Sequence, residues 1–237
     1  MDKETQQKLL NIVKKNYEDI ADDFNQTRQK QLWPELVKLA ADVKDGDSVL
    51  DVGCGNGRLT AAFIKKNIKY VGVDQSQALI NLAQENIKAA NFQFSIFNFQ
   101  FRTGDILELD KLTQEKFDWI FCIAVLHHLP GQDLRLQALE QLKNRLKPNG
   151  KIVITVWNLW GRWKYLKLIL INALLRLIGK NKMDFGDIVF DWSKNKSQRY
   201  YHAFTAKALS ADFSRATLKI RTIYRDSYNY YSVVEKP

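Results

Sequence analysis

Val49-Leu50-Asp51-Val52-Gly53-Cys54-Gly55-Asn56-Gly57 is the stretch that decides the fold, because an apolar strand passes directly into a glycine-rich loop. The glycine spacing, G-x-G-x-G, lets the backbone approach a ligand closely. It differs from the G-x-G-x-x-G fingerprint with which dinucleotide enzymes bind pyrophosphate. A second apolar run, Lys69 to Val73, ends at Asp74, where a carboxylate can accept hydrogen bonds from the two hydroxyls of a ribose. The two stretches together indicate a nucleoside site and disfavour NAD.

The charge of the loop narrows the ligand further. Asp51 would repel a phosphate, but it would attract a cation. S-adenosylmethionine combines an adenosine with a cationic sulfonium and an amino-acid tail, and it carries no phosphate. The loop therefore predicts S-adenosylmethionine as the cofactor.

Length and cysteine content predict one intracellular domain. A chain of 237 residues suits a single domain with a substantial core. Its two cysteines, Cys54 and Cys122, are too few for a disulfide framework and lack the neighbours of a metal site, so no metal is expected. No secretory leader is recognisable at the N-terminus, and a cytoplasmic protein is expected.

Basic charge is concentrated in the last third of the chain. Residues 1–150 contain 20 Lys or Arg and 20 Asp or Glu, whereas residues 151–237 contain 16 and 6, so the net charge of +10 arises after residue 150. This asymmetry predicts an anionic partner for the C-terminal part, with RNA or a membrane surface as the candidates. Ordinary solubilising charge is the alternative.

Apolar strands alternate with helical patterns through the middle of the chain, which predicts a parallel sheet covered on both faces. The expected helices are 3–24, 31–43, 57–66, 77–90, 131–147 and 205–213, and the expected strands are 48–52, 69–73, 98–103, 117–123, 151–157, 217–224 and 228–234. The last two strands would form a closing hairpin. The single domain divides into N-terminal helices (1–43), a cofactor core (48–157), a basic lid or substrate insert (158–204) and a C-terminal helix with its hairpin (205–237).

Two segments stand out from this alternation. In residues 91–101 the sequence N-F-Q-F occurs twice with a change of phase, which predicts a bulge or an extra edge strand. Residues 160–180 are apolar and basic, and too short to span a bilayer. A lid or packing helix, a partner-binding helix and a membrane-surface helix remain open for this segment.

The order of these motifs resembles the class I S-adenosylmethionine-dependent methyltransferases. The glycine loop, Asp74, Gly104-Asp105, Val125-Leu126-His127-His128-Leu129 and Lys147-Pro148-Asn149-Gly150 follow that family's order. The resemblance implies an α/β Rossmann-like fold with a seven-stranded, mostly parallel sheet, helices on both faces, a closing antiparallel hairpin and a helical insert after the fifth strand. It also implies that Asp105 bonds the adenine amino group, Asp74 the ribose, and the loop the methionine part. The expected cofactor contacts are Asp51, Gly53, Cys54, Gly55, Gly57, Asp74, Gln75, Asp105, Ile106 and Ile123.

A narrower resemblance covers nearly the whole chain. Four stretches are similar to the methyltransferases that esterify carboxymethyluridine at the wobble position of tRNA, including the methyltransferase part of the AlkB-type tRNA hydroxylase. They are Tyr17 to Phe24 with Thr27-Arg28-Gln29-Lys30 and Trp33-Pro34, Val156-Trp157, Asp187 to Trp192, and Arg199-Tyr200-Tyr201-His202-Ala203-Phe204. Departures occur at Gln31-Leu32, Asp191 and Lys207-Ala208-Leu209.

This resemblance suggests an acceptor carboxylate, which is already ionised at neutral pH and needs orientation by a cation more than it needs a base. Arg28 and Arg199 are the candidates for that task. Tyr200, His202 and Trp157 are expected to shape the site or stack on a base, with Trp33 also binding substrate, and Lys30 is expected to meet phosphates. His127 with His128 offers a competing mechanism, because a hydroxyl or ring-nitrogen acceptor would need a general base.

The function predicted first is methylation of a carboxymethyl-type wobble uridine, with tRNA as partner. The alternative is a small-molecule O- or C-methyltransferase, for example for a quinone-like substrate, that contacts a membrane surface through 160–180. A module that binds the cofactor without catalysis is a third class. Related eukaryotic enzymes work with a small zinc-binding activator, and the sequence leaves such a partner open.

Overall fold

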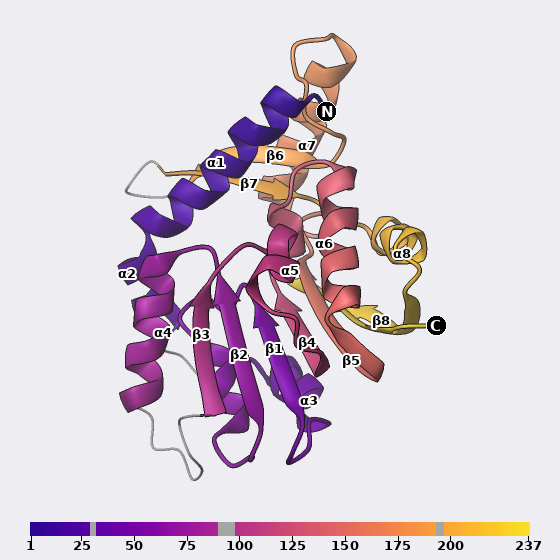
Figure 1. Ribbon diagram of the computed structural model, residues 1–237. Helices are drawn as coiled ribbons and strands as arrows, with labels where there is room; N and C mark the ends of the chain where they lie inside the picture. The colour runs from indigo at the N-terminus through magenta and orange to yellow at the C-terminus, as the bar shows by residue number, and fades with distance from the viewer. Residues whose placement is uncertain (29–31, 90–97, 193–196) are drawn as a thin grey trace.

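The protein is built on one seven-stranded sheet with helices on both faces (Figure 1). The computed structural model describes residues 1–28, 32–89, 98–192 and 197–237. The strand order is β3-β2-β1-β4-β5-β9-β8. These strands are β1 (Ser48–Val52), β2 (Lys69–Asp74), β3 (Phe99–Thr103), β4 (Phe117–Ile123), β5 (Leu146–Trp157), β8 (Lys219–Arg225) and β9 (Asn229–Glu235).

Strands β1 to β5 are parallel, and β9 is antiparallel to both β5 and β8. This arrangement confirms the expected mostly parallel sheet and its closing hairpin. The order reverses between β1 and β4, because the chain runs outward from β1 through β2 to β3 and then returns to the other side. In open α/β sheets, ligands bind beyond the carboxyl ends of the strands at such a reversal.

Side-chain alternation along the strands produces two apolar cores. On β1, Leu50 and Val52 face the core that α6 and α8 cover, whereas Val49 faces the core that α3 covers. The helices are α1 (Lys3–Asp19), α2 (Ala21–Arg28), α3 (Pro34–Ala41), α4 (Gln77–Ala89), α5 (Leu109–Leu112), α6 (Gln132–Asn144), α7 (Trp163–Leu177) and α8 (Ala206–Arg215), with short 3-10 segments η1 (Arg58–Phe63), η3 (Ile106–Glu108) and η4 (Leu126–His128).

A second layer lies over the carboxyl ends of the parallel strands. Figure 1 shows α1, α7 and a two-stranded antiparallel sheet on the side toward which β1 and β2 point. That small sheet pairs β6 (Asp187–Trp192) with β7 (Ser197–His202). Leu9 and Val13 of α1 pack against Tyr200 of β7, which joins the N-terminal helix to the insert. The layer therefore closes over the place where the glycine loop ends.

Several expected elements differ in detail. The helix expected over 3–24 is two helices that meet at Ile20, and this break lets α1 follow β7 while Phe24 reaches the glycine loop. The helix expected over 57–66 is a 3-10 segment, and β5 begins at Leu146 instead of Lys151. No strands were expected in the insert, yet β6 and β7 form there. Of the repeat at 91–101, residues 91–97 lie outside the described part of the chain.

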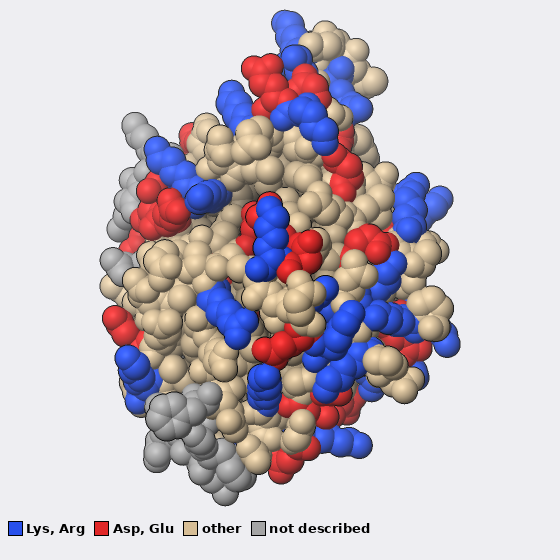
Figure 2. All heavy atoms as spheres, in the orientation of Figure 1, with Lys and Arg blue, Asp and Glu red and all other residues tan. Residues whose placement is uncertain are grey.

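Charge is mixed on the face that carries α4 and α6. Figure 2 shows Lys and Arg interspersed with Asp and Glu over that face, with no large area of one sign. Among the helices that the structure describes, α7 included, none has the length and hydropathy needed to span a bilayer.

Candidate functional site

A cavity of about 380 Å³ opens at the carboxyl ends of the strands, below α1. Its wall combines the ends of β1, β2 and β4 with the roof made by α1 and α2. The residues that line it are Leu10, Val13, Tyr17, Phe24, Trp33, Leu36, Asp51, Val52, Gly53, Cys54, Gly55, Asn56, Arg58, Leu59, Val73, Asp74, Gln75, Leu79, Gly104, Asp105, Ile106, Ile123, Ala124, Val125, His128, Leu129, Trp157, Arg162, Tyr228 and Asn229. Nine of the ten residues expected to contact the cofactor are among them, and Gly57 lies outside the lining.

The glycine loop forms a cradle that side chains would fill. Gly53 has φ +72°, and a Cβ there would stand 2.2 Å from Val125 Cγ2. A Cβ on Gly55 would stand 3.1 Å from the Phe24 ring, and one on Gly57 3.1 Å from Ala83 Cβ. Glycine is required at Gly53 for two independent reasons, since the backbone is left-handed and the space is already taken.

Gly53→Ala is expected to destabilise the protein and to weaken cofactor binding. The left-handed backbone costs about 1 kcal/mol, and the overlap with Val125 adds about 1–3 kcal/mol. Gly46→Ala is a matched control, because Gly46 has φ +87° but nothing within 4 Å of its Cβ position. Thermal unfolding of both variants separates the two costs; equal losses would contradict the steric argument.

Asp51 is a buried carboxylate. None of the described groups that shift its pKa is a cation. Its side chain is 2% exposed, and Oδ2 accepts a hydrogen bond of 2.5 Å from the Tyr70 hydroxyl. Burial raises the pKa of Asp51 to about 7, the Tyr70 bond lowers it, and the charge of Asp74 raises it further. Such a group is costly in the ligand-free state and favours a positively charged ligand.

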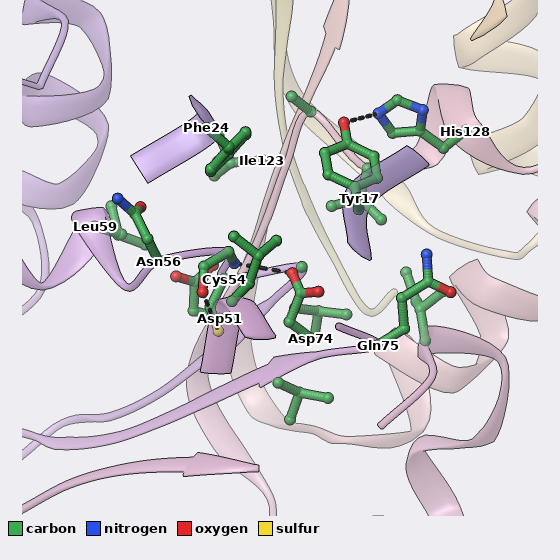
Figure 3. A pocket seen from close by; sticks show the side chains of 18 of the residues that line it. Tyr17, Phe24, Asp51, Cys54, Asn56, Leu59, Asp74, Gln75, Ile123 and His128 are labelled. Atoms are coloured by element: carbon green, nitrogen blue, oxygen red, sulfur yellow. Dashed lines mark hydrogen bonds between the residues drawn. The ribbon is translucent and has the colours of Figure 1, made fainter. Parts of the chain in front are cut away.

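Asp74 lies at the end of β2, across the loop from Asp51 (Figure 3). Its Oδ2 accepts from the Gly55 N–H at 2.9 Å and its Oδ1 from the Ser76 N–H at 2.9 Å. Burial raises the pKa of Asp74 although these bonds oppose the rise. Asp105 begins η3, where its Oδ1 accepts from the Leu107 N–H at 2.9 Å. Each carboxylate is thus anchored by backbone donors and retains lone pairs for a ligand.

Tyr17 and His128 form a hydrogen-bonded pair in the roof of the cavity (Figure 3). The Tyr17 hydroxyl lies 2.8 Å from His128 Nε2, and His128 Nδ1 lies 3.4 Å from the Tyr200 carbonyl oxygen. A carbonyl only accepts, so Nδ1 carries the proton and Nε2 accepts from Tyr17. Burial lowers the pKa of His128 to about 3, and the nearby charge of Arg199 contributes. The imidazole is therefore neutral at physiological pH.

The two adjacent histidines lie in different places. His127, proposed as a base, is fully buried, does not line the cavity, and accepts from the Trp157 N–H through Nδ1 at 3.4 Å. Burial lowers its pKa well below the ordinary value. The 3-10 turn η4 directs only His128 into the cavity, so a base at this site would be His128 and not His127.

The side chains of Arg199, Tyr200 and His202, which were expected at the substrate site, contact Asp187 and Asn16. The Tyr200 hydroxyl donates to Asp187 Oδ1 at 2.8 Å, and His202 Nδ1 lies 2.7 Å from the same oxygen. Arg199 donates from Nε to Asn16 Oδ1 at 3.3 Å. None of Arg199, Tyr200 and His202 is among the residues that line the cavity. Their side chains join β7 to β6 and α1, which gives them a structural role in this geometry, and the catalytic role expected for them stays a prediction.

The N-terminal candidates divide between described and undescribed positions. Arg28 ends α2, but its side chain lies outside the described part, as does Lys30 entirely. Trp33 and Trp157 both line the cavity. The Trp157 ring lies 4.8 Å from the Tyr201 ring and 5.4 Å from the His127 ring, measured between centroids.

Two arginines that the sequence did not single out line the cavity. Arg58 follows Gly57 directly, and its guanidinium lies 5.2 Å from the centroid of the Trp33 ring. Arg162 precedes α7, and its guanidinium lies 5.2 Å from the centroid of the Tyr165 ring. The position of Arg58 directly after the glycine loop could have indicated from the sequence that it lines the cavity. No local signal distinguished Arg162 from the other cations of the insert.

Similarity to known proteins was found at three levels. The family model described as "Methyltransferase domain" matches residues 43–211, more than half of the chain. The tRNA (carboxymethyluridine(34)-5-O)-methyltransferase alkbh8 of Xenopus tropicalis is 28% identical over an alignment covering 94% of this chain and 40% of that protein. A crystal structure of a SAM-dependent methyltransferase from Methanosarcina mazei is similar with a TM-score of 0.73, 18% identity, and coverage of 87% of this chain and 99% of that one.

A further structural neighbour is a putative methyltransferase of Haloferax volcanii in complex with the Trm112 methyltransferase activator. It has a TM-score of 0.65 and 16% identity, and the match covers 95% of this chain and 97% of that one. The chain spans 22% to 40% of the length of the first curated relatives that it matches.

Proposed function

This chain belongs to the methyltransferase-domain family, and from that premise we propose that it methylates the carboxylate of a carboxymethyl-type wobble uridine in tRNA, with S-adenosylmethionine as donor. The observation that carries the proposal is the composition of the cavity. Acidic side chains line its floor, and two arginines with aromatic partners line it elsewhere. The names of the curated relatives support the same acceptor.

The floor of the cavity fits the proposed cofactor. Asp51 is a buried carboxylate with no cation among the described groups that shift its pKa, and the glycine cradle excludes every side chain larger than hydrogen at Gly53. We assign the cationic end of the cofactor to Asp51 and the loop, the ribose hydroxyls to Asp74, and the adenine amino group to Asp105. When bound, the cofactor supplies an electrophilic methyl group on a sulfonium.

At the acceptor side, the residues have to position a nucleophile and exclude water. A carboxylate needs no general base, and alignment for in-line attack is worth about 7–11 kcal/mol. Arg58 and Arg162 can each hold a carboxylate or a phosphate through paired N–H donors. Trp33 and Trp157 offer flat faces for a base that has been taken out of its stack.

The Tyr17 and His128 pair favours a second candidate, methylation of a hydroxyl or ring nitrogen. A neutral imidazole that accepts from a phenol can take up a proton that an acceptor passes through Tyr17. A small metabolite with an ionisable hydroxyl would use this pair, whereas a carboxylate would use Tyr17 only as a hydrogen-bond donor. Tyr17→Phe separates the two functions, because it would abolish methylation of a hydroxyl or ring nitrogen and would slow methylation of a carboxylate only modestly.

The direct test is transfer of labelled methyl groups to total tRNA from a strain that lacks this gene, followed by nucleoside mass spectrometry. Label in a base-labile uridine ester supports the proposal. Cofactor binding without transfer, both alone and with a Trm112-type protein added, would exclude it and redirect the search to small acceptors.

Arg58→Gln and Arg162→Gln are each expected to lower kcat/KM for tRNA by about 10- to 100-fold, since each removes a charge-assisted contact. The loss should appear mainly in KM, and cofactor affinity should stay within about twofold. Arg102→Gln is the matched control, because Arg102 bonds Gln100 and does not line the cavity. An equal loss in the control would show that general basic charge, and not these two positions, binds the acceptor.

A further inference from the structure

Helix α7 presents an apolar stripe to solvent. Tyr165 and Ile169 face inward and are buried at 3% and 0% exposure, so the helix is fixed against β6 and β7. On the opposite side of the helix, exposed apolar residues recur at the helical spacing i, i+7, i+11, i+14. Its exposed members are Trp163 (69%), Leu170 (56%), Ile171 (54%), Leu174 (60%), Leu177 (85%) and Ile178 (56%). A surface helix normally exposes a polar side, whereas α7 buries one apolar side and exposes a second.

Basic side chains lie on and beside this stripe, and acidic ones are absent from the segment. Between Trp160 and Met183 the sequence contains Arg162, Lys164, Lys167, Arg176, Lys180 and Lys182, and neither Asp nor Glu. At the end of the molecule where Figure 1 places α7, Figure 2 shows tan atoms beside Lys and Arg, with Asp and Glu also present there.

Two acidic residues close to this segment are paired with cations. Asp2 is paired with Lys182 at 2.9 Å, and Asp184 with Arg176 at 3.2 Å and with the N-terminal amine at 3.1 Å. In the described part of the chain, Lys164, Lys167 and Lys180 enter no ion pair, and the Lys167 ammonium lies 5.3 Å from the centroid of the Trp163 ring. The border of the stripe therefore keeps a positive charge.

We propose that the α7 stripe, defined as Trp163, Leu170, Ile171, Leu174, Leu177 and Ile178, docks on the surface of a lipid bilayer with anionic headgroups. A helix of 15 residues with one apolar side lies in the plane of a bilayer and does not cross it. The basic side chains near the stripe favour an anionic lipid surface, because cations beside an apolar stripe complement anionic headgroups. A second copy of this chain would bring the same cations face to face.

The inference is independent of the methyl acceptor, because every residue of the stripe lies outside the cavity lining. Docking would hold the enzyme at the bilayer through a preformed face, with no change in the fold. Arg162 lines the cavity and immediately precedes α7. The catalytic cavity would consequently lie close to the docked face.

Co-sedimentation with unilamellar vesicles tests the proposal. Phosphatidylcholine vesicles are compared with vesicles that also contain phosphatidylglycerol. The wild-type chain should associate with the anionic vesicles at least about tenfold more strongly, and added salt should weaken the association. The Leu174→Glu, Leu177→Glu double variant should lose at least about tenfold in association, and so should the Lys164→Gln, Lys167→Gln, Lys180→Gln triple variant.

Val37→Glu is the matched control, because Val37 is an apolar side chain with 48% exposure on α3, away from the stripe. Cofactor binding by each variant verifies that the fold is intact. Failure of the wild-type chain to associate with anionic vesicles would overturn the proposal, as would association that the leucine variant leaves unchanged. Light scattering that shows a dimer without lipid, converted to a monomer by the leucine variant, would assign the stripe to a second copy instead.

Discussion

Asp51→Asn is expected to weaken S-adenosylmethionine binding by about 10- to 100-fold while raising the unfolding temperature of the ligand-free protein at about pH 8. The two effects have one cause. The Asp51 carboxylate is 2% exposed, and within the described part of the chain its side-chain hydrogen-bond donor is the Tyr70 hydroxyl. It is destabilising without a ligand and becomes useful when a cation lies beside it.

The pH dependence follows from the pKa of Asp51, which burial raises from 3.8 to about 7. Between these values the folded chain retains a proton that the unfolded chain releases. Stability therefore falls as pH rises through this window, by up to about 4 kcal/mol. An asparagine removes this loss but leaves an N–H donor to satisfy, so we expect a net gain of about 1–2 kcal/mol at high pH.

Cofactor affinity should depend on pH in the opposite sense, because a cationic ligand binds the ionised form of Asp51. Affinity is expected to fall about tenfold per pH unit below about 7 and to level off above it. Isothermal titration between about pH 5.5 and 8.5 and thermal unfolding with and without ligand measure both effects. Asp51→Asn should give a flat binding profile. A variant that keeps the wild-type pH dependence would place the titrating group elsewhere.

Asp187→Ala is expected to destabilise the fold by about 3–5 kcal/mol, the largest loss of stability expected from one substitution here. Asp187 is fully buried at the start of β6 and accepts from three donors. They are the Tyr200 hydroxyl at 2.8 Å, His202 Nδ1 at 2.7 Å and the Asp184 N–H at 2.9 Å. Alanine would leave buried donors without an acceptor, and each one costs about 1–3 kcal/mol.

Asp187→Ala should also disturb the cavity, since the carbonyl of Tyr200 accepts a hydrogen bond from Nδ1 of His128, which lines the cavity. Denaturant unfolding measures the stability, and cofactor titration measures the effect on the site. Asp187→Asn keeps the size and one acceptor oxygen, so a smaller loss of about 1–2 kcal/mol is expected. Tyr200→Phe removes a single donor and should cost less than Asp187→Ala. If Tyr200→Phe or a His202 variant abolished methyl transfer while stability remained unchanged, these residues would have the catalytic role that the geometry does not support.

The amino-acid sequence by itself determined the cofactor half of the molecule. Gly53 requires a left-handed backbone, Asp74 ends a strand, and β1 and β4 are short, largely apolar runs. Each of these features depends on neighbours a few residues away. Such local requirements are readable in one dimension, because backbone conformation and side-chain period are set over short stretches.

Only the tertiary structure decided which side chains share the cavity. Adjacent histidines separate because η4 turns His128 toward Tyr17, which is 111 residues away in sequence, and His127 toward the backbone of Trp157. Tyr200 and His202 contact Asp187 because β6 and β7 pair. Arg58 and Arg162 line the same cavity although they lie on different elements. The outward apolar side of α7 depends on which of its sides packs on the insert. These outcomes depend on contacts between distant segments, and no short stretch of sequence contains the geometry that produces them.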